Sequence, residues 1–366
     1  MKNSITRQSR KRKKQRKPPK LTIGIDLGDR TSRYCVLNED GEITVEASVR
    51  TKRQELVATF GRMGRQRIAM EVGTHSPWVS RLLASLGHEV IVANARQLQL
   101  ITASSRKCDP LDARMLAQMA RVDPRLLRPI RHRSEQAQLD LVKIRVRARL
   151  VEMRTEAANS ARGLAKALGE RLPSTDTDQL GVASLNKLAE PLRQALKPLL
   201  ESVEELTRKI RVLDKEIEQI AGQRYPETEL LTQVYGVGTL IALTFVLTID
   251  DKERFGQSRD VGCYLGLRPK RSDSGEREPQ LSITKEGDVY LRKLLVQAAQ
   301  CILRPRAPDS DLRQAGERIA GNGSKNAKKR AVVAVARKLA VLLHRLWVTG
   351  EVYEPLRNSR SQRAAA

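Results

Sequence analysis

The sequence predicts an α/β domain built on a mixed sheet, followed by long helices that include a coiled coil, and then a mainly helical second domain. Three strand-like segments joined by tight turns come first, and strands then alternate with helices up to about residue 130. Between residues 192 and 220, apolar residues recur at intervals of three and four. A chain of 366 residues is long enough to bury the cores of two domains.

Short apolar runs bounded by turn residues predict the strands of the first domain. Gly28 begins the turn after the first strand, and residues 39–41 form the turn before the third. Pro77 opens a helix that Gly87 ends. The strands whose limits the pattern defines cover residues 21–25, 33–37, 68–70 and 88–93. Antiparallel strands followed by strand–helix alternation predict a sheet flanked by helices.

Four carboxylates stand where these elements begin or end. Asp26 closes the first strand, Glu71 closes the strand at residues 68–70, and Asp109 and Asp112 fall in the first turn of a helix that Pro110 helps to start. Two strand ends and one helix start can converge on one point. Oxygen-only ligands suit Mg²⁺ or Mn²⁺, and two such ions can assist displacement at a phosphodiester.

Each carboxylate also has a structural interpretation. Asp109 and Asp112 have the spacing of a helix cap and its partner, and helix starts favour negative charge in any case. Asp26 and Glu71 could be ordinary residues at the ends of strands. The metal-site hypothesis therefore depends on the four occurring together.

The charge of the chain predicts a polyanionic partner. The formal net charge is +26 and the pI is about 10.4, and residues 1–20 are strongly basic without one acid, which predicts a disordered arm. No apolar run is long enough to span a membrane, and no secretory segment is recognisable. The four cysteines form no CxxC pair, which argues against a zinc ribbon and for reduced thiols in a cytosol.

A long helix is predicted from Ser134, a candidate N-cap, to about residue 168. A solvated helix face would explain some of its positive charge. Few acids compensate that charge, however, so we interpret the helix as a nucleic-acid track formed by Lys143, Arg145, Arg147 and Arg149. Residues 169–184 have the composition of a linker. The next helix carries a heptad seam, whose partner is either the preceding helix or another protomer, and Pro198 predicts that this helix begins or kinks there. The seam consists of Leu192, Leu196, Leu199, Val203, Leu206, Ile210, Leu213, Ile217 and Ile220.

The second domain begins near Thr228 with two helices separated by Gly236 and Gly238. These glycines are either a phosphate-binding turn or a structural corner. A polar loop further on contains Ser274 followed by glycine, and a helix from about residue 327 to 347 ends the domain. The cations around that loop that could hold a phosphate are Arg268, Lys270, Arg271 and Lys285.

These motifs, taken in order, resemble a known family. Asp26, Glu71 and the run at residues 109–113 resemble the DEDD, RuvC-like domain of insertion-sequence transposases. The runs at residues 235–238, 264–275, 283–288, 291–295 and 336–339 resemble the second transposase domain of the insertion sequence 110 family. The resemblance covers about residues 20–355. Glu276 and Glu278 depart from the more basic or glycine-rich pattern that follows the serine in this family.

The resemblance implies a RuvC-like, ribonuclease-H-type fold and a recombinase that a structured bridge RNA guides to donor and target DNA. It implies that Asp26, Glu71, Asp109 and Asp112 bind Mg²⁺ and that Ser274 attacks the DNA phosphate to give a phosphoserine. It also implies a coiled-coil dimerisation segment, and a dimer or tetramer in the bacterial cytoplasm. Residues 1–20 are expected to form a disordered basic arm and residues 21–133 the RuvC-like catalytic domain. Residues 134–224 are expected to form the long helices and coiled coil, residues 225–355 the second transposase domain with the serine, and residues 356–366 a disordered tail.

Two other functions compete with this interpretation. A metal-dependent nuclease, such as a junction resolvase, would use water as the nucleophile, and Ser274 would then be a turn residue. A non-catalytic RNA- or DNA-binding protein would use the four acids only as helix caps and strand ends. A covalent protein–DNA adduct distinguishes the recombinase from the nuclease, and a Mg²⁺ requirement distinguishes either from the binding protein.

Overall fold

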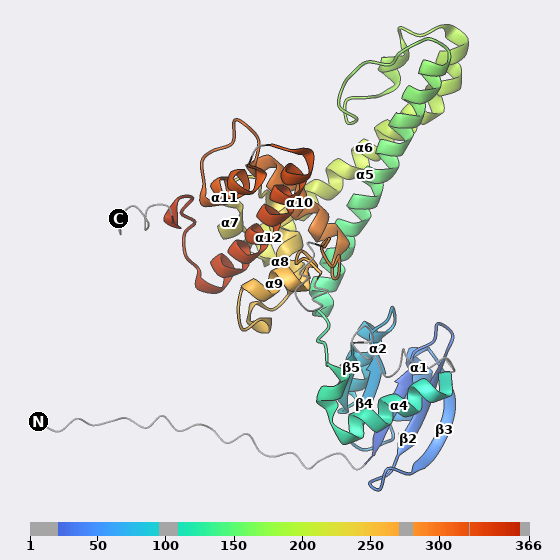
Figure 1. Ribbon diagram of the computed structural model, residues 1–366. Coiled ribbons are helices and arrows are strands. Elements are labelled where there is room, and N and C mark those ends of the chain that lie inside the picture. Colours follow the sequence, from blue (N-terminus) through green and yellow to red (C-terminus); the bar gives the residue numbers. More distant parts are fainter. Residues whose placement is uncertain (1–20, 95–108, 271–280, 322, 359–366) are drawn as a thin grey trace, which may run out of the picture. The chain divides into compact units, whose positions relative to one another are not determined.

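The computed structural model describes residues 21–94, 109–270, 281–321 and 323–358, although the side chains of residues 109–111 are not described. The chain divides after His132 into two compact units, called here the N-terminal and the C-terminal unit (Figure 1). The N-terminal unit contains the sheet. The C-terminal unit contains both long helices and the helical domain.

The N-terminal unit is built on a five-stranded mixed sheet with the order β3-β2-β1-β4-β5. Strand β1 pairs antiparallel with β2 and parallel with β4, while β2–β3 is antiparallel and β4–β5 is parallel. This arrangement confirms the predicted mixed sheet. The strands are β1 (Thr22–Asp26), β2 (Thr31–Leu37), β3 (Ile43–Arg50), β4 (Arg67–Glu71) and β5 (Glu89–Ala93).

The two faces of the sheet are covered by different helices. Alternate residues of a strand point to opposite faces, so Ile23 and Ile68 enter one core, with α1 (Arg53–Phe60) and α2 (Ser76–Ser85). Helix α4 (Asp109–Val122) lies across the other face (Figure 1). There its buried side chains pack against Cys35 and Leu37 of β2 and against residues of β4 and β5.

Gly24 allows α4 to lie directly on β1. A Cβ atom at this position would lie 2.0 Å from the Ala113 carbonyl oxygen and 2.6 Å from the Ala117 backbone nitrogen. Both atoms belong to the helix backbone, which cannot rotate away as a side chain can. Any side chain at residue 24 would therefore push the helix off the sheet.

The C-terminal unit begins with two long helices, α5 (Glu135–Ala167) and α6 (Glu190–Arg224). The Ser134 side chain accepts a hydrogen bond from the Ala137 backbone N–H, which confirms the predicted N-cap. Lys143 contacts Glu216, and Arg154 contacts Thr207, so α6 runs antiparallel to α5. The buried side of α6 therefore packs against α5, the preceding helix of the same chain.

The heptad seam of α6 is only partly the predicted one. Leu206 and Leu213 are half-buried, whereas Leu200 and Thr207 are buried at the neighbouring positions. The helix begins at Glu190 and continues through Pro198, so of the two predicted alternatives a start at this proline is wrong, while a kink there stays a prediction. Pro198 is exposed.

The helical domain packs around α8, which is apolar on all sides and almost completely buried. Phe245 of α8, Leu291 of α10 and Leu339 of α12 belong to its core. Gly350 has a φ of 70° and ends α12, close to the predicted limit. The helices are α7 (Glu227–Thr232), α8 (Thr239–Ile249), α9 (Arg259–Tyr264), α10 (Val289–Ile302), α11 (Asp311–Ala320) and α12 (Lys325–Thr349).

The contact at Gly24 predicts a large loss of stability on substitution. Gly24→Val should destabilise the N-terminal unit by about 3 kcal/mol, because the added methyl groups overlap the α4 backbone. The two tryptophans lie in different units, so a Trp347→Phe background lets Trp78 fluorescence report urea unfolding of the N-terminal unit alone. Gly73→Ala is the control, since nothing lies within 4 Å of its Cβ position. Equal stability of the two variants would contradict the close approach.

Candidate functional site

Asp26 and Glu71 lie at the carboxyl ends of two neighbouring parallel strands. In the pairing of β1 with β4, Ile25 is opposite Met70, so each acid is the next residue of its strand. Asp26 lies two residues beyond Gly24, and Glu71 lies two beyond Ala69. Because the side-chain period of a strand is two, both acids belong to the face of the sheet that α4 covers.

Helix α4 begins at this same edge of the sheet. Near its end, the Ala120 carbonyl oxygen accepts a hydrogen bond of 3.1 Å from Arg67, which is the first residue of β4. Ala113 lies over Gly24, in the middle of β1. The helix therefore runs antiparallel to β1, and its first turn, with Asp109 and Asp112, lies toward the end marked by Asp26. The Asp109 side chain lies outside the described residues.

An ion pair holds the first half of α4 over the sheet. Arg114 donates two hydrogen bonds to the Glu46 carboxylate of β3, and Glu46 is opposite Cys35 of β2. This contact is two residues from Asp112, and it lowers the pKa of Glu46 through the hydrogen bond from Arg114. Burial, followed by the charge of Glu46, raises the pKa of the Cys35 thiol to about 11. Cys35 is therefore a neutral core residue at pH 7.

The donor chemistry of this edge fits a hard divalent cation. Asp26, Glu71 and Asp112 offer carboxylate oxygens, which Mg²⁺ and Mn²⁺ prefer. Among the side chains that the structure describes, no three His, Cys, Asp or Glu residues are grouped closely enough to bind a metal ion. The fold brings the residues that carry these carboxylates to one edge of the sheet.

The loops that follow β1 and β4 are tied together by His75, which the sequence analysis did not single out. The Trp78 indole N–H donates to His75 Nδ1 at 3.0 Å, and His75 Nε2 lies 3.1 Å from an Asp29 carboxylate oxygen. Because an indole can only donate, Nδ1 accepts and Nε2 carries the proton directed at Asp29. The only signal in the sequence was a histidine four residues after Glu71, with a tryptophan three residues further on.

The predicted nucleic-acid track on α5 is neutralised within the chain. Lys143 pairs with Glu216 at 2.6 Å, Arg147 with Asp214 at 2.6 Å, and Arg149 with Glu152 at 3.2 Å. Arg145 pairs with Asp288. The expectation that few acids compensate these charges is therefore wrong, because most of the partners come from α6 and from the start of α10, which are distant in sequence.

Asp288 links α5 to the start of α10. Burial opposes its ionisation, but hydrogen bonds from Arg145 and from the Leu291 backbone N–H, with the charges of Arg145 and Arg133, lower its pKa overall. The same carboxylate is the N-cap of α10. Arg145 also lies 4.9 Å above the Tyr290 ring. These contacts give Arg145 a structural role.

The glycine turn between α7 and α8 is a packed corner. Gly236 has a φ of 84°, and a Cβ atom there would lie 3.0 Å from the Ala298 carbonyl oxygen and 3.3 Å from Cys301 Cβ of α10. Gly238 is the N-cap residue of α8. The close contact with α10 accounts for Gly236 without a ligand and favours the structural interpretation of this turn.

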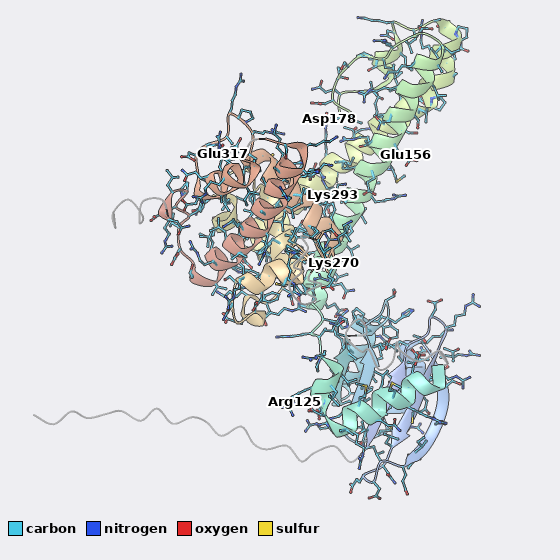
Figure 2. All side chains as sticks on the ribbon, in the orientation of Figure 1. Arg125, Glu156, Asp178, Lys270, Lys293 and Glu317 are labelled. Atoms are coloured by element: carbon cyan, nitrogen blue, oxygen red, sulfur yellow. The ribbon has the colours of Figure 1, made fainter. Side chains whose placement is uncertain are left out.

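The structure does bring three predicted cations together on a short hairpin stem. Pro269 forms an isolated antiparallel bridge with Ile283, and backbone hydrogen bonds of 2.9 Å join Lys270 to Ser282 and Thr284 to Arg268. We call residues 268–270 and 282–284 the hairpin stem. Lys270, labelled in Figure 2, and Arg268 lie on this stem, and Lys285 follows it directly in the sequence. All three residues are exposed. Arg271 and Ser274 lie outside the described residues.

No helix among the described residues is both long enough and apolar enough to cross a membrane. Cys35, Cys263 and Cys301 are free thiols, and Cys108 is not described.

Comparison with known proteins identifies the family. A family model described as a transposase, of the DEDD type of IS110, matches residues 23–169, and a model of the transposase IS116/IS110/IS902 family matches residues 228–314. A putative transposase of Sinorhizobium fredii is 31% identical over 347 residues, which cover 92% of this chain and 87% of the relative.

Two further relatives have names that specify transposition. The transposase for insertion sequence element IS1111A of Coxiella burnetii is 25% identical, over 94% of each chain. The probable family 20 transposase of Pseudomonas aeruginosa is 26% identical, over 91% of this chain and 98% of the relative. Together with the matches above, these show that the chain belongs to the IS116/IS110/IS902 family of transposases, enzymes that act on DNA.

Proposed function

We propose that this transposase cleaves and rejoins DNA through a phosphoserine intermediate, with a carboxylate site that binds Mg²⁺ or Mn²⁺ and with Ser274 as the nucleophile. The observation that carries the proposal is the position of Asp26 and Glu71 at neighbouring strand ends, on the face of the sheet where α4 begins. Asp109 and Asp112 in the first turn of α4 complete the set of four acids.

The chemistry divides between the two kinds of residue. The Ser274 oxygen would form a bond to phosphorus and lose its proton, while the bond from phosphorus to the leaving sugar oxygen breaks and that oxygen gains a proton. Phosphoserine formation conserves the ester, so the reverse reaction with another DNA end rejoins a strand without ATP. Divalent ions, when bound, supply positive charge to the developing negative charge at phosphorus.

The proposed partners follow from charge and family. A net charge of +26 suits donor and target DNA together with a structured guide RNA, the bridge RNA that the resemblance implies. Arg268, Lys270 and Lys285 are the predicted phosphate contacts that remain supported, because no described acid lies within ion-pair distance of them. We assign residues 21–133 to the metal site, 134–224 to assembly, and 225–355 to the serine and DNA contacts, and we place the reaction in the bacterial cytoplasm.

A second copy of the chain is the proposed partner of α5. Its residues Ala137, Ile144 and Ala161 are buried. A different face carries an apolar stripe that remains exposed, although a soluble helix normally presents polar residues there. The stripe consists of Leu139, Val142, Val146, Met153 and Leu164, spaced as on one side of a coiled-coil helix. The pairing of α6 with α5 leaves this stripe as the seam available to another protomer.

One gel experiment tests the proposed chemistry. Protein is incubated with guide RNA, Mg²⁺ and labelled DNA, and denatured samples are examined for a protease-sensitive adduct. Asp26→Asn and Asp112→Asn should abolish cleavage and adduct, because an amide keeps the shape but not the charge. Ser274→Ala should lose the adduct, and Ser272→Ala should keep it.

The control for the acids is Glu39→Gln, an exposed carboxylate in the turn between β2 and β3. This variant should leave DNA cleavage and adduct formation unchanged. An adduct that survives in Ser274→Ala would move the nucleophile elsewhere. Cleavage without an adduct in any variant would instead favour a hydrolytic nuclease.

Assembly through the α5 stripe predicts a change in mass. Val142→Asp with Val146→Asp should lower the mass measured by light scattering toward the 41.1 kDa of one chain, because two unpaired charges would enter an apolar interface. Val212→Asp is the control, since it places a charge at an exposed apolar position of α6 outside the stripe. A stripe variant with the same mass as the wild type at low concentration would exclude this interface.

A further inference from the structure

The C-terminal unit contains a groove of about 1060 Å³ that has no role in the proposed reaction. Helices α11 and α12, the hairpin stem and residues 353–358 form its walls. The groove is bordered by Pro269, Leu281 and Ile283, which flank the segment that contains Ser274. Its floor is aliphatic and includes Leu267, Ile283, Leu312, Val333, Val341 and Leu342.

The wall formed by α12 carries the positive charge. Lys329, Arg337 and Arg345 line the groove at intervals of eight residues, and Arg330 and Lys338 repeat the same interval one residue later. Eight residues of an α-helix span about 12 Å. Positive charge is therefore repeated along the groove instead of gathered at one point, which suits a chain of phosphates better than a single anion.

The lining of the groove contains fewer acids than cations. Asp311 and Glu354 are the carboxylates in its lining, and Asp311 already accepts a hydrogen bond of 2.8 Å from the Asn358 backbone N–H. Arg345 lies 3.9 Å from Glu351. Within the described part of the chain, no acid lies within ion-pair distance of Lys329, Arg337 or Lys338. This contrasts with α5, where each predicted cation has an acidic partner.

We infer that this groove binds one unpaired strand of DNA, with its phosphates on the α12 cations and its sugars and bases against the aliphatic floor. Duplex DNA presents phosphates outward and keeps its bases stacked, so it would cover the cations without filling the floor. The floor side chains offer no hydrogen-bond partner to a 2′-hydroxyl, the group by which proteins distinguish RNA from DNA. The inference rests on the proposed function only in taking DNA strands as the substrate.

The test compares two double variants of one helix. Lys329→Gln with Lys338→Gln removes two groove cations, and Lys325→Gln with Lys328→Gln removes two equally exposed lysines of α12 that do not line the groove. Binding of a fluorescent single-stranded DNA oligonucleotide is measured by anisotropy at several salt concentrations. Each lost phosphate contact lowers the slope of log affinity against log salt by about 0.7 for single strands, so the groove pair should lower it by about 1.4. The other pair should leave it unchanged.

A variant of the floor tests the apolar part separately. Ala334 lines the groove and is half-buried, so Ala334→Phe should fill it and weaken binding of the single strand without changing the salt slope. Circular dichroism and the thermal transition check that each variant is folded. RNA and duplex DNA of the same sequence are measured in parallel and should be affected less than the single strand.

Two results would overturn the inference. One is an equal change of salt slope in the two lysine pairs, which would mean a diffuse charge effect. The other is a loss that falls mainly on RNA or on duplex DNA, which would assign the groove to that ligand. Asp26→Asn should retain binding of the single strand, so a failure of the carboxylate site and a failure of the groove give different results.

Discussion

The backbone contact between α4 and β1 at Gly24 is the constraint on which the candidate site depends. Because residue 24 has no side chain, the helix backbone can reach the strand, with Ala113 directly over it. The ion pair of Arg114 with Glu46 and the hydrogen bond from Arg67 to Ala120 then fix the direction of the helix. With that direction set, the first turn of α4 lies at the strand ends that carry Asp26 and Glu71.

The distribution of charge separates structure from binding. Cations on α5 are paired with acids of α6 and α10, and they hold the helices of the C-terminal unit together. On the hairpin stem, and at Lys329, Arg337 and Lys338 of the groove wall, no acid of the described residues lies within ion-pair distance of the cation. A high density of Lys and Arg in the sequence thus says little about where nucleic acid binds. Where nucleic acid binds depends instead on whether the fold places an acid beside each cation.

Local patterns were sufficient to predict the sheet of the N-terminal unit and several helix ends of the C-terminal unit. Apolar runs, turn residues and caps act over a few residues, so the mixed sheet, the Ser134 cap and the end of α12 near Gly350 could be predicted from sequence. The positions of Asp26 and Glu71 at strand ends followed in the same way. Their roles in catalysis remain predictions.

Features that depend on register between distant segments could not be predicted. The pairing of Arg147 with Asp214 requires the antiparallel alignment of α5 and α6, which no local pattern encodes. The same holds for His75 with Asp29, which are 46 residues apart, and for the groove, whose lining comes from five separate segments. The displacement of the α6 seam toward Leu200 and Thr207 likewise reflects the fit to α5.

Binding of Mn²⁺ to the full chain tests most directly whether the packing of α4 on β1 creates a metal site. Mn²⁺ is titrated by calorimetry and by electron paramagnetic resonance into the wild type, Glu71→Gln and the control Glu39→Gln, without nucleic acid. The fold predicts that Glu71→Gln loses the binding seen in the wild type and that Glu39→Gln retains it. Equal Mn²⁺ binding by all three proteins would contradict a site at the ends of β1 and β4.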